Sequence, residues 1–132
     1  MADPDRPDVR RARPPLRWPG QRDGDLWVTG DTVLYGGVRA VAGRLRVGVM
    51  LLHLGGVQFP LTGPVRYTMT AREAVTLCGL VQPRTVVPVH YEGWLHFRQG
   101  REAAEREFAA APAQIRDAIR WLPLGEPTPV DL

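Results

Sequence analysis

Apolar positions along the chain form short runs that predict strands, separated by segments whose apolar residues recur at helical spacing. Residues 46–54 are apolar with little alternation, which is typical of a strand buried on both faces in the middle of a sheet. Shorter β-branched or aromatic runs predict strands at residues 26–28 and 85–89. We also expect a hairpin arm near residues 16–18 and a last strand over residues 119–124.

The segments between these runs predict helices. Thr70-Ala71-Arg72-Glu73 has the spacing of a capping box, so a helix begins there, and Pro83 ends it. Residues 101–111 predict a second helix, and shorter helices are expected over residues 33–45 and 113–118. This alternation of strands and helices predicts an α/β fold with a largely parallel or mixed sheet and crossover helices.

Candidate chemistry lies where the predicted strands end. Asp31 follows a strand and a glycine, His53 ends the central run, and His90 ends the run at residues 85–89. Parallel connections place the ends of these strands at the same edge of the sheet, where α/β proteins bind ligands. Other interpretations stay open, because Asp31 suits a turn or a helix N-cap, and a histidine at a strand end is often structural.

Composition indicates one soluble globular domain with a separate amino-terminal arm. The 132 residues are 44% hydrophobic and 23% charged, which is ordinary for a soluble domain with one core. Residues 1–15 mix arginine, aspartate and proline with almost no apolar residues, so we expect a disordered arm there and a folded domain over residues 16–132. Clustered arginines suit nucleic acid, but the interspersed aspartates and missing aromatics make that partner unlikely.

Cysteine use and hydropathy bear on the compartment. Cys78 is the only cysteine, so it cannot form an internal disulfide. It lies on the apolar stripe of the helix predicted between the capping box and Pro83, which predicts a buried structural thiol. No signal peptide is recognisable, and the longest apolar stretch falls far short of the roughly 18 residues that span a bilayer. A cytoplasmic protein without a membrane segment is therefore expected.

Four segments taken together resemble a known family. They are Gly30-Asp31-Thr32, Met50 to Gly55, Thr68 to Ala74, and Val87-Pro88-Val89-His90. In order and spacing they are similar to the second, C-terminal half of a metallo-β-lactamase-fold metallo-hydrolase, over roughly residues 24–130. The resemblance implies a mixed sheet with helices mainly on one face, corresponding to one βα half of that family's αββα sandwich.

The resemblance also implies roles for individual residues. It makes Asp31 and His90 metal ligands, with zinc as the expected cofactor and another divalent metal as the alternative. Residues 55–67 and 91–97 would border the substrate cleft. Further residues expected in the cleft, or supporting the ligands, are His53, Tyr91, Glu92 and His96. Of these, His53 is also a candidate third donor.

The family's H-x-H-x-D-H motif has no counterpart in this sequence, whose only histidines are His53, His90 and His96. Catalytic zinc needs about three protein ligands and a water position, so we expect a truncated or split hydrolase half, with no catalytic residue and no activity of its own. The expected partner is the missing N-terminal half, a second copy or another chain, bound through an exposed sheet face. The alternative function is a non-catalytic interaction module that uses this face.

Overall fold

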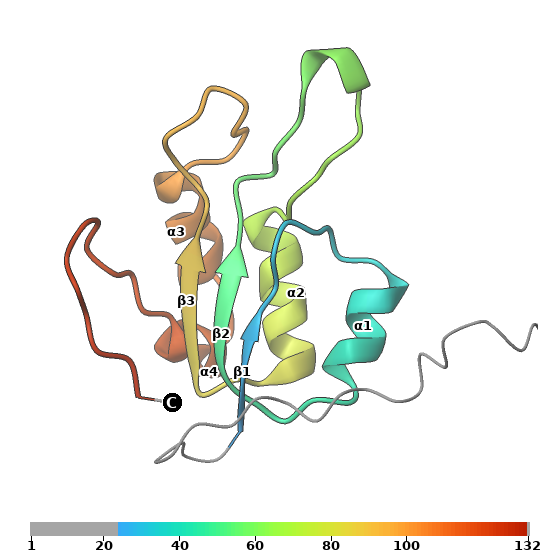
Figure 1. Ribbon diagram of the computed structural model, residues 1–132. Coiled ribbons are helices and arrows are strands. Elements are labelled where there is room, and N and C mark those ends of the chain that lie inside the picture. Colours follow the sequence, from blue (N-terminus) through green and yellow to red (C-terminus); the bar gives the residue numbers. More distant parts are fainter. Residues whose placement is uncertain (1–23, 132) are drawn as a thin grey trace, which may run out of the picture.

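The three strands of the sheet run parallel, in the spatial order β1, β2, β3 (Figure 1). In the computed structural model, which describes residues 24–131, they are β1 (Asp25–Val28), β2 (Val47–His53) and β3 (Thr85–Val89). The unbroken apolar run therefore forms the central strand, as its pattern predicted. The predicted α/β class is confirmed, and all the strand pairs of the described residues are parallel.

The helices lie on one face of the sheet, two of them between strands and two after the last strand (Figure 1). They are α1 (Gly36–Ala42), α2 (Ala71–Val81), α3 (Arg101–Ala109) and α4 (Ala113–Ala118), with a 3-10 turn, η1 (Pro60–Thr62), before α2. None of the helices formed by the described residues has the length and apolar character that crossing a membrane requires.

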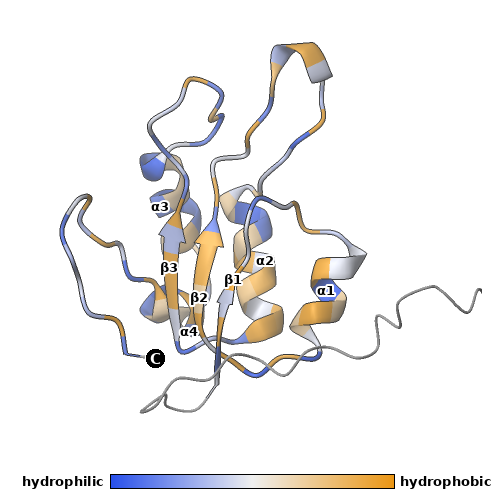
Figure 2. Ribbon diagram, viewed as in Figure 1, coloured by the Kyte–Doolittle hydropathy of each residue, from blue (hydrophilic) through white to orange (hydrophobic). Residues whose placement is uncertain are grey.

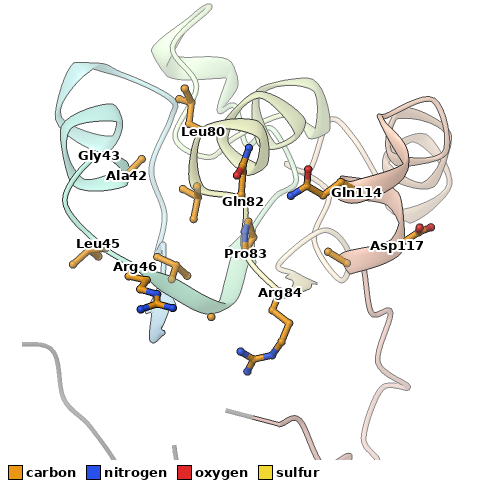
Figure 3. A pocket seen from close by; sticks show the side chains of 14 residues that line it. Ala42, Gly43, Leu45, Arg46, Leu80, Gln82, Pro83, Arg84, Gln114 and Asp117 are labelled. Carbon is orange, nitrogen blue, oxygen red and sulfur yellow. The ribbon is translucent and has the colours of Figure 1, made fainter. Parts of the chain in front are cut away.

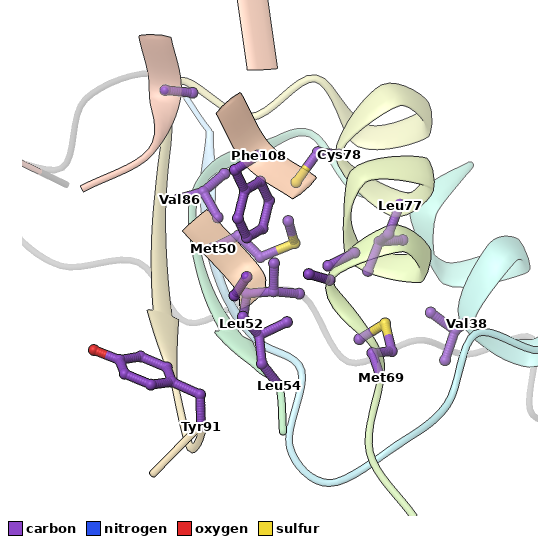
Figure 4. Packing of buried hydrophobic residues seen from close by; sticks show 14 of the residues in the cluster. Val38, Met50, Leu52, Leu54, Met69, Leu77, Cys78, Val86, Tyr91 and Phe108 are labelled. Atoms are coloured by element: carbon purple, nitrogen blue, oxygen red, sulfur yellow. The ribbon is translucent and has the colours of Figure 1, made fainter. Parts of the chain in front are cut away.

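The main core lies between the sheet and these helices (Figure 4). Met50 and Leu52 of β2 and Val86 of β3 are fully buried against Leu77 of α2 and Phe108 of α3. Burial of such side chains contributes about 1.5–3 kcal/mol each, so this layer dominates the stability of the domain. The predicted buried cysteine is confirmed. Burial raises the pKa of Cys78 to about 12, which keeps the thiol protonated and inert.

The capping box that opens α2 is formed as predicted. The Thr70 hydroxyl accepts from the backbone N–H of Glu73, and the Glu73 carboxylate accepts from the backbone N–H of Thr70. Arg66, in the loop before α2, donates two hydrogen bonds of 2.8 and 2.7 Å to the same carboxylate. Burial alone would raise the pKa of Glu73, but the hydrogen bonds from Arg66 and Thr70 outweigh it and lower that pKa below its ordinary value.

Two predicted elements differ from the structure. The last strand predicted over residues 119–124 is wrong: Ile119 makes only an isolated parallel bridge to Val86, and the chain then leaves the sheet. Pro123 lacks the N–H that a longer ladder would need. The helix predicted over residues 33–45 is shorter than expected, because it begins at Gly36 instead of running through that glycine. The expected arm and hairpin partner at residues 1–18 lie outside the described residues.

The second face of the sheet is apolar but lies away from the four helices. Side chains alternate along a strand, so the residues between those that face the helices point the other way. This second face carries Leu26 and Val28 of β1, Val49 and Leu51 of β2, and Val87 and Val89 of β3. Val28 is half exposed, whereas Val49 and Val87 are buried. Figure 2 shows the strong apolar colour of β2, which serves both faces.

Candidate metal centre

The carboxyl edge of the sheet, where all three strands finish, brings Asp31 and His90 together. Asp31 lies just after β1 and His90 just after β3. The Oδ1 atom of Asp31 is 3.6 Å from the Nδ1 atom of His90. The two side chains keep 59% and 31% of their surface exposed, so both remain open to a ligand arriving from above the edge. Parallel strand order is what allows residues so distant in sequence to meet there.

His90 is held in an unusual backbone conformation. Its φ is +60°, in the left-handed region that L-residues other than glycine enter rarely. This turn directs the imidazole back over the edge, where Nδ1 lies 3.4 Å from the backbone carbonyl of Leu54. A proton on Nδ1 facing that carbonyl leaves the lone pair of Nε2 for a metal, an arrangement common among histidine ligands. Backbone strain of this kind clusters at functional sites, which makes His90 a candidate functional residue.

His53, the third predicted histidine of the edge, lies beside His90 with 5.6 Å between the ring centres. Its backbone N–H donates to the hydroxyl of Thr29, which fixes the end of β2 against the end of β1. The Nδ1 atom of His53 is buried and has no hydrogen-bond partner within residues 24–131. Burial lowers the pKa of His53; Asp31 opposes this shift and His90 adds to it. The ring is therefore held in its neutral, ligand-competent form.

These donors fit part of a metal site. The 3.6 Å separation joins Oδ1 of Asp31 to Nδ1 of His90, so it shows that the two side chains are neighbours, while the ring nitrogen left for a metal is Nε2. Carboxylate plus imidazole suits zinc, manganese or iron. Residues 24–131 contain no group of three or more His, Cys, Asp or Glu side chains arranged to hold an ion. The described residues thus offer two facing donors, and a complete site requires more.

The other predicted cleft residues lie in different surroundings. Tyr91 is buried, with its ring edge-on to Trp121 at 5.3 Å, and burial followed by the charge of Glu92 raises its pKa. Glu92 itself is exposed on the loop after β3. His96 contacts Phe59, 4.9 Å away between ring centres, whereas the rings that pack against His90 within residues 24–131 are those of His53 and Phe97. His96 therefore belongs with the aromatic loops and not with the donors.

Gly55 holds the two loops above the carboxyl edge together. It has a φ of +99°, and a Cβ there would lie 2.7 Å from the carbonyl oxygen of His90. Its own carbonyl accepts hydrogen bonds from the backbone N–H groups of Arg98 and Gln99 at 2.9 and 3.1 Å. Both loops were predicted to border the cleft, but this close approach was not predicted. The Gly55-Gly56 pair directly after a strand was the available signal.

A hollow of about 850 Å³ lies at the opposite, amino edge of the sheet (Figure 3). It is lined by residues from the end of α1, the end of α2, the beginning of β2, the turn before β3, and α4. Gln82 and Arg84 are among them. The hollow is therefore separated from Asp31 and His90 by the full length of the strands, and it has no part in the candidate metal centre.

Sequence comparison connects this chain with metal-dependent hydrolases. It is 34% identical over 80 residues to a UPF0173 metal-dependent hydrolase of Pyrobaculum arsenaticum, covering 61% of this chain and 32% of that protein. A UPF0173 metal-dependent hydrolase of Thermococcus kodakarensis is 34% identical over 83 residues, covering 63% and 31%. The chain thus spans about a third of the length of the curated relatives it matches. No protein-family model matches the chain.

Structural comparison gives the same fold. An isothiocyanate hydrolase from Delia radicum gut bacteria matches with a TM-score of 0.69 and 19% identity, covering 83% of this chain and 40% of that one. Igni18, a metallo hydrolase of Ignicoccus hospitalis, matches with a TM-score of 0.52 and 24% identity, covering 76% and 39%. The resemblance seen in the sequence is confirmed: the chain is similar to part of a metallo-hydrolase of the metallo-β-lactamase superfamily, and a C-terminal half fits.

Proposed function

We propose that this chain is the half of a metal-dependent hydrolase that supplies Asp31 and His90 to the metal centre. The observation that carries the proposal is the 3.6 Å approach of Asp31 to His90 at the carboxyl edge. The relatives named above are metal-dependent hydrolases, which supports this assignment. The metal we propose is zinc. Manganese and iron are the alternatives, because they also bind carboxylate and imidazole ligands.

Each residue at the edge has a role of its own in this proposal. His90 offers Nε2 while its Nδ1 faces the carbonyl of Leu54, and Asp31 offers an exposed carboxylate oxygen. His53 supports the ring of His90 from the side. When bound, the ion would supply Lewis-acid activation of the scissile group and of water. The remaining ligands come from a complementary half with H-x-H-x-D-H, on the same polypeptide or on another.

The second face of the sheet is the proposed docking surface for that half. Its residues are apolar and none of the four helices covers them. Val49 and Val87 in its middle are already buried, so the part open to a partner lies at β1, where Val28 is half exposed. Apolar sheet faces in α/β proteins are normally covered, so a partner layer is expected here. A second copy of the chain, or use of the face in a purely non-catalytic interaction module, is the competing outcome.

Activity measurements test the proposal. The purified chain should hydrolyse ester, lactam, lactone and phosphodiester probes no faster than background, because two donors do not hold an ion in a catalytic geometry. Adding a polypeptide with the complementary half should restore turnover, and Asp31→Ala or His90→Ala should each abolish it. His96→Ala is the matched control, with a smaller loss. Chelator-sensitive hydrolysis by the lone chain, restored by zinc, would contradict the proposal.

Calorimetry tests the metal role without any activity. The chain should bind zinc weakly, and the double change Asp31→Ala with His90→Ala should remove the binding. A tight site that survives both changes would refute the assignment.

Val28→Asp tests the docking surface, because it places a charge on the second face at a half-exposed position. It should prevent complementation while leaving the circular dichroism spectrum unchanged.

A further inference from the structure

Five aromatic side chains from two loops form a continuous surface next to His90. This ring group consists of Phe59 and Tyr67 from the loop before α2, and Trp94, His96 and Phe97 from the loop after β3. In Figure 1 both loops rise beyond the carboxyl ends of the strands. The metal role proposed above does not use these rings, so their concentration at this edge needs a separate explanation.

The rings contact one another in sequence, starting from the candidate ligand. Phe97 packs edge-on to His90 at 4.9 Å, and His96 packs edge-on to Phe97 at 5.1 Å. Phe59 follows at 4.9 Å from His96. Tyr67 ends this path at 5.3 Å from Phe59, while Trp94 stacks on His96 at 5.7 Å. A flat group that lies on these rings therefore lies within reach of the atoms of His90.

Backbone hydrogen bonds hold the ring group in place. Gln58 N–H donates to the carbonyl of His96, which joins the two loops between their rings. Tyr67 N–H donates to the carbonyl of Val57, and Arg98 N–H donates to Gly55, so the bases of both loops are fixed. A surface assembled in advance binds a ligand without the entropy loss of ordering loops.

The rings remain accessible although they contact one another. Trp94 is 69% exposed, and Tyr67 and Phe59 are 40% and 38% exposed. Large aromatic side chains that stay exposed together mark binding sites, because packing in the core would otherwise bury them. The ring group offers several aromatic faces side by side and contains no Asp, Glu, Lys or Arg, so its chemistry favours a flat aromatic ligand that stacks on them.

We propose that the ring group binds the aromatic portion of the substrate, so that the hydrolysed bond belongs to a molecule with a flat aromatic group beside it. This inference rests on the proposed hydrolase function, because it names the class of substrate that the same site would bind. The rings form one wall of the binding site, and the complementary half forms the other.

Binding to the purified chain tests the inference without metal and without turnover. Benzamide and cyclohexanecarboxamide are neutral and similar in size, and only the first is aromatic. In an NMR titration, benzamide should shift the ring signals of Trp94, His96 and Phe97, with a dissociation constant at least fivefold lower than that of the saturated amide. Equal affinity of the two probes, or shifts confined to other residues, would overturn the inference.

Substitutions locate the binding. Trp94→Leu and Phe59→Leu should each weaken benzamide binding about three- to tenfold, because each removes one ring face from an exposed position. Leu80→Ala, at the end of α2 near the amino edge, is the matched control and should change nothing. Ring signals that move with protein concentration before any probe is added would assign the surface to a second copy and refute the inference. Failed complementation with intact benzamide binding would refute only the hydrolase function.

Discussion

The two edges of the sheet are built very differently. At the amino edge the connections are short, with residues 43–46 between α1 and β2 and residues 82–84 between α2 and β3. At the carboxyl edge they are long, with residues 54–70 after β2 and residues 90–100 after β3. The long connections hold the aromatic rings and the strained His90, whereas the short ones only reverse the chain. Loop length therefore concentrates where α/β proteins place ligands.

The two edges can also be compared at single positions, through the non-glycine residues that have a positive φ. Among the described residues they are Gln82, at the amino edge, and His90, at the carboxyl edge. Gln82 ends α2, a place where a left-handed residue is common and glycine is usually preferred. His90 ends a strand and faces Asp31, so its strain is tied to the position of an imidazole. Equal backbone conformations thus serve a helix cap in one case and a candidate ligand in the other.

The largest effect is expected from Gly55→Ala, which forces apart the loops of the carboxyl edge. The added Cβ would lie 2.7 Å from the carbonyl oxygen of His90, on a residue whose φ is already +99°. Strain and overlap together should lower the free energy of unfolding by about 3 kcal/mol. Urea unfolding measures the change.

Gly93→Ala is the control for that substitution. Gly93 has nearly the same φ, +102°, but a Cβ there meets nothing within 4 Å. It should lower the free energy of unfolding by only about 1 kcal/mol, from backbone strain alone. Equal losses at the two glycines would show that the contact with His90 carries no weight.

A smaller effect is expected from Glu73, which ties the loop before α2 to that helix. Glu73→Ala removes the capping box and the paired hydrogen bonds to Arg66, and should cost about 2 kcal/mol at pH 7. Glu73→Gln keeps a capping group without the charge, so about half of that loss is expected. Thermal unfolding of the three proteins in parallel measures both changes.

The pH dependence of the Glu73 effect follows from the direction of its pKa. The folded state lowers the pKa of Glu73, so its contribution is fully present above the ordinary glutamate pKa of about 4.3 and is lost as the pH falls through the lower folded value. The difference between wild type and Glu73→Gln should therefore be constant near neutrality and shrink in acid. A difference that grows on acidification would contradict this.

The sequence predicted most of the fold because its strongest signals are local. The apolar run of β2 and the capping box of α2 each depend on a few neighbouring residues, and both are present. The expected last strand failed because its pairing with β3 stops at a single bridge, from Ile119 to Val86, and a ladder depends on residues far away in sequence. Strand pairing is a tertiary property, so local propensity alone overestimated it.

The candidate site was predicted in part for a related reason. Parallel order brought Asp31 and His90 to one edge, and the structure places their side chains 3.6 Å apart. The left-handed backbone of His90 and the close approach at Gly55 depend on contacts between loops, which no spacing in the sequence encodes. The ring group escaped notice for the same reason, since its members come from two separate loops.

A still smaller difference in stability is expected between two substitutions of His90, the strained candidate ligand. His90→Gly and His90→Ala both remove the imidazole and its contact with Phe97, but only glycine adopts a φ of +60° without strain. His90→Gly should therefore be more stable than His90→Ala by about 1 kcal/mol, while both lose zinc binding. Thermal unfolding and calorimetry measure the two properties. Equal stability of the variants would mean that His90 stores no backbone strain.

The smallest effect is expected at the matching position of the amino edge. Gln82→Gly relieves the same kind of strain, because Gln82 has a φ of 53° and its N–H already closes α2 on the carbonyl of Cys78. Glycine loses more freedom on folding, which offsets part of the gain, so the net stabilisation should be about 0.5 kcal/mol. Gln82→Ala keeps the strain and should not stabilise.

Zinc binding distinguishes the substitution of Gln82 from the substitutions of His90. Gln82→Gly should leave zinc binding and the NMR signals of His90 unchanged, because the full length of the strands lies between the two edges. The strain at Gln82 could then be removed without loss of zinc binding, whereas the strain at His90 can be removed only together with the imidazole. A change in zinc affinity on Gln82→Gly would instead reveal that the two edges are coupled through β3.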